Sequence, residues 1–372
     1  MPKFVDGILG LVSESDLLAT GFNVTRPNDP LEGLFTDRQT NNLVATWHTM
    51  ASEYKISQMA QFHAFDVIAQ KSERVPIDER NIEKGLIKVK RNTSELLRQL
   101  MGRGVQVEAE LYNFVTDDNA ALADQVVTRA KVARAELMGT GHVTIKENGL
   151  DLTVDYGIPE GNLSLEIDLS DGAAKDILDQ FQTIVDNATD KGVTLTGMIC
   201  PKSFLTKLRK NSVIQKAING TAQDGILVRN AALTAFLGDE FGITQIITDD
   251  LSYALPYDTY DENGRPVVKT NRYFPNNKVT FFGTVNGMLL GAGLWGVPPE
   301  VEIANFMQVQ GSTESPYVYV SQWAEKDPAV IWTKASALYM PVLFSPDSLY
   351  IATIKEGESQ NDEGGESQDQ GA

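Results

Sequence analysis

Two extended arms around a charged turn are the feature that most constrains how this chain can fold. From Ile56 the sequence is first apolar, becomes highly charged around Pro76, and returns as GLIKVKRN, residues 85–92, where apolar and basic residues partly alternate. This pattern predicts a long two-stranded excursion. An isolated two-stranded ribbon is marginally stable in water, so it needs another surface to lie on. The surface belongs either to the same monomer or to a neighbouring copy, and the arms alone do not choose.

The charge balance argues against one class of partner. The 372 residues include 32 basic and 50 acidic side chains, which gives a net charge of −18. A strongly acidic surface repels the phosphate backbone, so the chain is a poor candidate for a nucleic-acid reader. The hydrophobic content of 42% is enough for at least one sizeable core.

Compartment signals are few. The single cysteine, Cys200, cannot form an intrachain disulfide and suits a reducing cytoplasm. Asp6 precedes the short apolar stretch near the N-terminus, which is unlike a secretory signal. The longest nearly apolar stretch, residues 287–297, is interrupted by glycine and too short to span a bilayer. We therefore expect a soluble protein that is made inside the cell and has no membrane partner.

Before the middle of the chain, residues 1–41 mix glycine, proline and polar residues, which predicts a loose N-terminal arm. Residues 42–50 are compatible with either a strand or a short helix. Thr93-Ser94 can cap a short helix that stops near Gly102.

The middle of the chain predicts a long helix and a hairpin. Thr116 can cap the helix, and Asp117 and Asp118 in its first turn complement the helix dipole. Gly139 ends the helical run. Its narrow apolar stripe, which allows close approach to a sheet, consists of Leu122, Val126, Ala130, Ala133 and Leu137. Asn148-Gly149 then predicts a tight turn between two strands.

A second domain is predicted from residue 170. Its strands and helices alternate, which indicates an α/β arrangement. The expected elements are a helix over 171–187, a strand over 193–200, a helix from Pro201 to Lys210, a helix over 229–237 and a strand over 243–248.

The last part of the chain predicts strands and a tail. Residues 253–274 form a polar hairpin with Asn263-Gly264 at its tip, and a strand covers 278–284. From Tyr317 the sequence is strand-like. Beyond Lys355 it is acidic, with no apolar residue larger than alanine, which predicts disorder.

A search for catalytic, cofactor and metal sites finds none. His48, His63 and His142 lack metal-ligand spacing, and Cys200 has no histidine near it in sequence to act as a base. Residues 291–296 match the dinucleotide pattern, but Pro298-Pro299 forbids the helix that such a site requires, so we predict an irregular loop.

The polar hairpin also hints at a calcium loop. If Gly264 held the sixth position of that loop, Thr259 and Thr270 would occupy positions that require carboxylates. A hairpin turn is therefore the better interpretation, and no cofactor or metal is expected.

Two basic clusters remain. In a nucleic-acid-binding protein such clusters would face phosphates, whereas in an acidic chain that meets copies of itself we expect them to face carboxylates of a neighbour. They consist of Lys84, Lys88, Lys90 and Arg91 on the returning arm, and Lys202, Lys207, Arg209, Lys210 and Lys216 on the predicted helical segment.

The order of these parts resembles the lambda-like major capsid proteins of tailed bacteriophages, the E family, which have the Hong Kong 97-type fold. Four stretches carry the resemblance: DDNAALADQVVTRAKVARAELMGTGHVTI, VTLTGMICPKSFLTKLRKN, RYFPNNKVTFFGT and WAEKDPAVIWTKASALYMPVLFSPDSLYIATI. The likeness covers roughly residues 42–354, and the N-terminal arm and acidic tail match no family pattern.

The resemblance implies an α+β Hong Kong 97-type capsid fold with six parts. These are an N-terminal arm (1–41), an extended loop with flanking strands (42–92), a peripheral domain with the spine helix (93–169), an α/β axial domain (170–315), closing strands that return to the peripheral domain (316–354) and a disordered acidic tail (355–372). It also implies that the axial domain directs residues 253–274, or nearby loops, toward the capsomer axis.

The implied function is that of a non-enzymatic coat protein. Copies assemble into hexamers and pentamers with a scaffolding protein and a portal protein, and a decoration protein can be added. The head encloses double-stranded DNA without sequence-specific contacts, and the host cytoplasm is the place of assembly. The expected intersubunit contacts of the extended loop are Glu73, Arg74, Asp78, Glu79, Arg80, Lys88, Lys90 and Arg91.

Two other readings stay open on the sequence. One is an encapsulin-like shell protein of a bacterial compartment, which shares the fold but holds protein cargo. The other is an α/β hydrolase or nucleotide-using enzyme built on residues 170–300, for which Cys200 and Gly293 would be essential.

Overall fold

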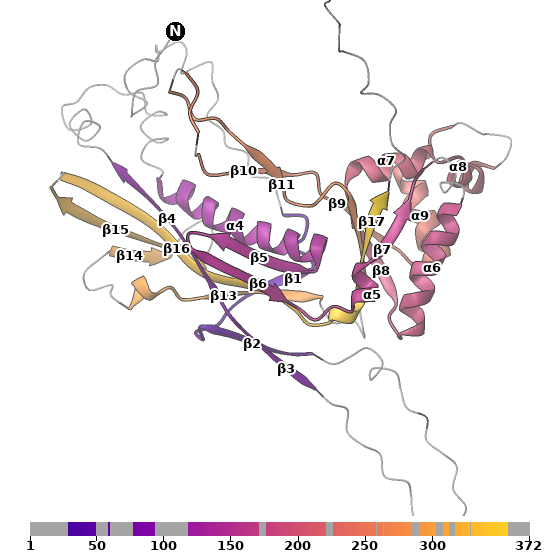
Figure 1. The fold of residues 1–372 in the computed structure, drawn as a ribbon, viewed down its shortest axis with the longest axis horizontal. Coiled ribbons are helices and arrows are strands. Elements are labelled where there is room, and N and C mark those ends of the chain that lie inside the picture. The colour runs from indigo at the N-terminus through magenta and orange to yellow at the C-terminus, as the bar shows by residue number, and fades with distance from the viewer. Residues whose placement is uncertain are drawn as a thin grey trace, which may run out of the picture.

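The computed structural model contains two packed bodies, each built around one sheet (Figure 1). It describes residues 29–49, 59, 77–93, 118–170, 176–220, 226–257, 259–262, 264–283, 290–302, 308–311, 317–327 and 329–355. The predictions for the first 28 residues, the arm from Ile56, the turn at Pro76, the helix after Ser94 and the tail beyond Lys355 lie outside these residues.

The first sheet is built around the long strand β16. Leu338 of β16 pairs with Leu86 of β4 and with Gly296 of β13, so these two strands lie on opposite edges. β15 pairs with β16 along the same edge as β13. β1 then pairs with β13, and β14 pairs with β15, which extends the sheet. The strands are β1 Phe35–Gln39, β4 Gly85–Thr93, β13 Gly291–Gly296, β14 Gln308–Gly311, β15 Tyr319–Lys326 and β16 Ala329–Leu343.

Helix α4, Asp118–Thr140, packs on one face of this sheet and confirms the predicted long helix. All five residues of its predicted stripe are buried. They contact the face of β16 that carries Ala335, Ala337 and Tyr339, because small side chains on both elements let the helix approach the sheet.

Two hairpins flank the first sheet. β5 His142–Glu147 and β6 Leu150–Asp155 confirm the predicted hairpin, and its turn residues Asn148 and Gly149 both have positive φ, as a type I′ turn requires. β2 Val44–Thr49 pairs with β3 Asp78–Glu83 in a two-stranded ribbon. In Figure 1 this ribbon and α4 lie on opposite sides of the first sheet.

The second body confirms the predicted α/β pattern. Its sheet has the order β7-β17-β12-β8-β9, in which β8 and β9 are parallel and joined through helices. The strands are β7 Leu165–Asp168, β8 Leu195–Cys200, β9 Gln245–Thr248, β12 Lys278–Gly283 and β17 Leu349–Lys355. The helices are α6 Ile177–Asp190, α7 Lys202–Lys210, α8 Ser212–Asn219 and α9 Asn230–Phe241, and Figure 1 shows them grouped beside this sheet.

Short elements complete the described chain. The predicted polar hairpin is present as β10 Ser252–Ala254 and β11 Thr270–Arg272. Figure 1 shows it running from β9 back toward the N-terminal end of α4, away from α6–α9. Three single turns remain, α5 Glu160–Leu163, η5 Pro299–Val301 and η7 Pro346–Ser348.

Three expectations about strands were wrong. The returning arm, residues 85–92, is not part of the ribbon, because it pairs with β16 in the first sheet and β3 takes its place opposite β2. Of the closing strands, β17 pairs with β12 and β7 in the second sheet instead of returning to the first. β13 and β14, expected within the axial segment, belong to the first sheet.

Residues 291–296 are also not a loop but the buried strand β13. Their glycines serve close packing between strands. A Cβ atom on Gly291 would lie 2.3 Å from the Val342 carbonyl oxygen, and one on Gly296 would lie 2.8 Å from the Leu338 Cβ. Side chains at these positions would separate the strands, which is why a glycine run can sit within a sheet.

Candidate assembly surface

The base of the β2–β3 ribbon packs against the first body through one face of β2. Ala45 and Trp47 are buried, whereas Val44, Thr46 and His48, which alternate with them, are exposed. The Trp47 ring lies 6.1 Å from the ring of Tyr156. Tyr156 donates a hydrogen bond of 2.8 Å to the Pro341 carbonyl of β16, and burial raises the pKa of its hydroxyl. Residues 44–49 of the ribbon therefore pack against their own subunit.

The β3 strand brings three predicted contact residues together. Asp78, Glu79 and Arg80 line a hollow of about 350 Å³ together with Asn81, Ile82 and Asp155. The Arg80 guanidinium lies over Gly157, where a Cβ atom would come within 2.2 Å of Nη2. Gly157 also has a positive φ of 69°, so the absence of a side chain and the backbone angle both favour glycine there. The hollow is open and polar, and its charged walls are suited to contact with another protein surface.

The returning-arm residues Lys88, Lys90 and Arg91 lie on β4, away from the ribbon. All three are exposed. The ammonium of Lys90 lies 4.2 Å from the centre of the Trp332 ring, a cation–π contact. Trp332 stacks on Trp323 at 6.3 Å, and its Nε1 donates a 2.7 Å hydrogen bond to Glu325. Lys90 therefore already contacts an aromatic side chain of its own sheet while it stays exposed.

Lys84, which we expected to face a neighbour, is buried instead. Its ammonium donates to the Asn42 carbonyl at 2.7 Å and to the Trp295 carbonyl at 3.3 Å, and it also contacts the carbonyl and hydroxyl of Thr40. Desolvation lowers the pKa of Lys84. This side chain joins the turn between β3 and β4 to the segment before β2, so its role is internal.

The remaining predicted contacts, Glu73 and Arg74, lie outside the described residues. The structure therefore brings Asp78, Glu79 and Arg80 together on β3 and places Lys88, Lys90 and Arg91 together on β4. It does not join the two groups into one cluster on the ribbon.

A buried arginine network was not foreseen. Arg134 of α4 donates to the Tyr339 hydroxyl at 2.6 Å, lies 3.4 Å from an Asp29 carboxylate oxygen and contacts Asp37. Burial lowers the pKa of Arg134, but Tyr339 and Asp37 outweigh that effect and the net pKa is raised. The signal was its position, because Arg134 follows Ala130 by four residues and so lies on the apolar stripe.

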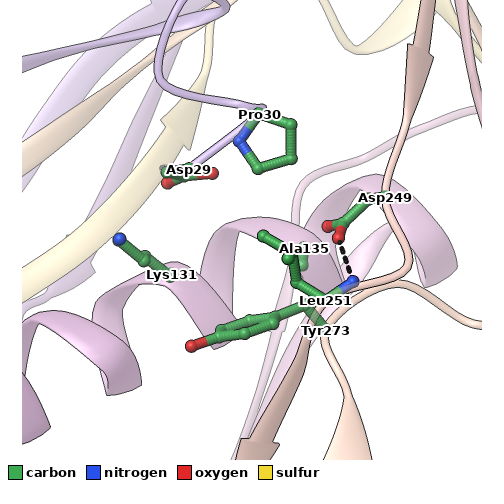
Figure 2. Close-up of a pocket in the computed structure, with 7 residues that line it drawn as sticks. All are labelled: Asp29, Pro30, Lys131, Ala135, Asp249, Leu251 and Tyr273. Carbon is green, nitrogen blue, oxygen red and sulfur yellow. Dashed lines mark hydrogen bonds between the residues drawn. The ribbon is translucent and has the colours of Figure 1, made fainter. Parts of the chain in front are cut away.

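Figure 2 shows a small cavity beside this network. Asp29 and Pro30 form one side, Lys131 and Ala135 of α4 form another, and Asp249, Leu251 and Tyr273 come from the base of the polar hairpin. Its volume of about 10 Å³ is room for one water molecule. Desolvation raises the pKa of Asp249, whose Oδ1 accepts a 3.0 Å hydrogen bond from the Leu251 amide. The cavity joins three segments but is too small for a ligand.

The residues on which an enzyme reading depends are not arranged for catalysis. Cys200 is fully buried, and desolvation raises the pKa of its thiol to about 12, so it is a structural side chain and not a reactive thiolate. Gly293 lies in β13, where an added Cβ would come 2.8 Å from Arg134 Nη2. A pyrophosphate has no space there.

The described residues also give no site for a metal ion. His48 and His142 are exposed on different strands, and His63 lies outside the described residues. No group of three potential ligands is close enough to hold a metal ion within the described ranges. None of the described helices is both long and apolar enough to cross a membrane.

Comparison with protein families decides which class this architecture belongs to. Residues 23–354 match the family described as phage major capsid protein E. This chain belongs to that family. The match spans α4, the ribbon and both sheets, so the major capsid protein E fold accounts for the arrangement as a whole. No curated protein matches the chain.

Several solved structures are similar at low sequence identity. A putative prophage capsid protein of Escherichia coli CFT073 has 15% identity and a TM-score of 0.46, with 75% of this chain and 79% of that chain covered. The mature capsid of bacteriophage PhiM1 has 9% identity and a TM-score of 0.47, covering 94% and 92%. A virus-like particle from Pyrococcus furiosus has 12% identity and a TM-score of 0.42, covering 87% and 91%. Membership of the major capsid protein E family rests on the family match.

Proposed function

We propose that this chain is the non-enzymatic structural subunit of a tailed-phage head, and that its copies form hexamers and pentamers around double-stranded DNA. The observation that carries the proposal is the family match over residues 23–354. The buried Cys200 and the filled surroundings of Gly293 support the view that the subunit performs no chemistry through these residues.

Within the head, we assign the exposed face of the β2–β3 ribbon to a contact with a neighbouring subunit. Asp78, Glu79 and Arg80 supply charges on one side, and Glu73 and Arg74, which lie outside the described residues, stay predicted contacts. Lys88, Lys90 and Arg91 on the first sheet supply a second contact, which is wholly basic. An exposed ion pair contributes only about 0–1 kcal/mol, but every subunit of a shell repeats it.

The remaining partners follow from the same role. A scaffolding protein guides assembly in the host cytoplasm, a portal protein occupies one vertex, and a decoration protein can bind the finished head. The net charge of −18 would limit adhesion of the packaged DNA to the inner wall.

Electron microscopy of the expressed full chain, alone and with its scaffolding protein, tests the proposal. We expect icosahedral shells that contain DNA when formed during infection. A chain that stays monomeric under both conditions would contradict the capsid role. Shells that contain a protein cargo and no DNA would instead identify a compartment shell of the encapsulin type.

The ribbon contact has a separate test. Glu79 is exposed, so Glu79→Lys should leave the thermal unfolding of the unassembled subunit unchanged while reducing the yield of shells. Glu79→Gln removes the charge without reversing it and should have the smaller effect. Equal shell yields for the three proteins would show that this face of the ribbon makes no contact with a neighbour.

A further inference from the structure

The ammonium of Lys84 lies where the β2–β3 ribbon leaves the first sheet, and its partners are uncharged. Lys84 is 3% exposed. Its Nζ donates to the carbonyl oxygens of Thr40, Asn42 and Trp295 at 3.0, 2.7 and 3.3 Å, and it contacts the Thr40 hydroxyl. Buried charges are normally paired with an opposite charge, and replacement of buried ionic groups by apolar side chains of similar volume is often neutral. Stability alone therefore does not explain a lysine at this position.

The partners of Lys84 come from both connections between the ribbon and the first sheet. Lys84 itself separates the end of β3 from the start of β4. Thr40 and Asn42 lie between β1 and β2, and Trp295 lies on β13, which pairs with β1. The backbone adds a bond of 3.0 Å from the Lys84 amide to the Leu43 carbonyl and one of 2.8 Å from the Thr40 amide to the Trp295 carbonyl. The two connections are thus joined to each other and to the sheet at one ammonium.

An ammonium group is suited to such a joint by its geometry. It carries three N–H donors on one atom, so a single group can hold oxygens of separate segments. Hydrogen bonds from a charged donor are also shorter and stronger than those from a neutral one. The stem of the side chain runs close to Gly296 of β13, where an added Cβ atom would lie 3.3 Å from Lys84 Cδ. The bonds of Lys84 therefore depend on the position of each segment relative to the others.

The apolar packing of β2 does not supply the same directionality. Ala45 and Trp47 are buried against the first body, and the Trp47 ring lies beside that of Tyr156. The Trp47 indole N–H has no hydrogen-bond partner among the described residues. Burial of apolar surface is non-directional, so it holds two elements together without fixing the angle between them. The packing of β2 therefore keeps the ribbon on the body, and its direction depends on the hydrogen bonds at its base.

We propose that Lys84 is a positioning residue, whose buried ammonium sets the angle at which the β2–β3 ribbon leaves the first sheet of the single subunit. Each ribbon strand has six residues and is about 20 Å long, so a rotation of about 10° at the base moves the far end by about 3–4 Å. A ribbon that is already oriented loses less conformational entropy when it docks. This benefit to assembly rests on the proposed function, whereas the angle is a property of the subunit alone.

A distance measurement between two spin labels on the unassembled subunit tests the proposal. One label is attached at His48→Cys on β2, and the other at Lys326→Cys at the end of β15; both positions are exposed. Cys200 is buried and should take no label. Double electron–electron resonance then gives the distribution of distances between the ribbon and the first sheet, and the doubly labelled protein with Lys84 intact is the reference.

Lys84→Met keeps a flexible apolar side chain and removes the ammonium. We expect its distance distribution to broaden, or its maximum to move by about 3 Å or more. Lys334→Met is the matched control, because it removes another largely buried ammonium of the first sheet, whose partner is Glu300. Lys334 lies five residues along β16 from Tyr339, which pairs with Gly85 at the start of β4. This control should leave the distance distribution of the reference protein unchanged.

Circular dichroism of each labelled protein shows whether it is folded. If Lys84→Met does not fold, Lys84→Gln takes its place, because an amide can still donate two hydrogen bonds while it lacks the charge. The expected result is then a smaller broadening in the same direction. If neither variant folds, Lys84 is required for the fold itself, and its assignment to the ribbon angle is wrong.

The outcomes distinguish this inference from the proposed function. An unchanged distance distribution in folded Lys84→Met overturns the role of Lys84, whether or not shells form. Equal broadening in Lys334→Met overturns it as well, because loss of any buried cation of the sheet would then loosen the ribbon. Unaltered protein that shows one narrow distance but forms no shells contradicts the capsid role, while the effect of Lys84 on the ribbon angle is still measured.

Discussion

The two bodies of this subunit are stabilised in different ways. The interior of the first holds paired polar side chains: Arg134 with Asp29 and Asp37, and Glu300 with Lys334 and Ser336. The interior of the second is chiefly apolar, with Phe181 at 5.6 Å from Phe241 and 5.5 Å from Phe281, and with the buried Cys200 thiol.

The difference reflects how far apart in sequence the packed segments lie. In the second body, α6 to α9 and their strands follow one another along the chain, so periodic apolar stripes suffice to bury them. The first body collects segments from residues 29–49, 77–93 and 290–343 around α4. Buried charges must be paired with defined partners, so they fix which segments meet, although a buried pair does not by itself add stability.

The largest expected effect is the loss of Arg134. Arg134→Met removes the cation that pairs with the Asp29 and Asp37 carboxylates. Because these carboxylates then lose their opposite charge, the free energy of unfolding should fall by about 3–5 kcal/mol. Urea denaturation of the unassembled subunit measures this. Arg129 of the same helix is the control, because Arg129→Met breaks its partly exposed 3.0 Å pair with Glu147 of β5 and should cost about 0–1 kcal/mol. Similar losses for both variants would contradict a special role for the buried network.

A polar atom in the second body should have an intermediate effect. Cys200→Ser places a hydroxyl in a fully buried apolar site and should cost about 1–3 kcal/mol. Cys200→Ala deletes the sulfur without adding a polar group and serves as the control. If serine is tolerated better than alanine, a polar partner is available at this position. The interior of the second body would then resemble the polar interior of the first more closely.

The smallest effect should be a gain, at the cavity where the hairpin meets the first body. Desolvation, Asp29 and Asp250 raise the pKa of Asp249, although Arg272 and the Leu251 amide oppose them. A carboxyl with a raised pKa stabilises the fold while it is protonated, and this stabilisation is lost as the pH rises through its folded-state pKa. Asp249→Asn should therefore stabilise the subunit by about 1 kcal/mol at neutral pH and by little at pH 4. Thermal unfolding at both values tests this, and an equal change at the two pH values would exclude ionisation of Asp249 as the cause.

Sequence periodicity predicted the elements whose burial is local. The stripe from Leu122 to Leu137 predicted α4, and Asn148-Gly149 predicted the hairpin turn. α8 was missed although Asn211 precedes it, whose Oδ1 accepts bonds from the amides of Val213 and Ile214. That capping signal was available in the sequence.

The remaining features depend on contacts between distant segments. The partner of residues 85–92 could not be chosen, because an alternating strand pairs equally well in a ribbon or a sheet. The glycines of β13 resembled a loop, since their close approach to β1 and β16 is visible only in three dimensions. For the predicted contact residues, the sequence indicated the charges but not that Lys84 turns inward while Asp78, Glu79 and Arg80 line a common hollow.

The passage of the chain between the two sheets has a mechanical consequence. It leaves the second sheet after β12 to enter the first at β13, and it returns between β16 and β17, while α4 contacts both β12 and β17. A single tether would act as a swivel, but several crossings resist torsion. We therefore expect the joint between the two halves to resist twisting when a load acts on one of them.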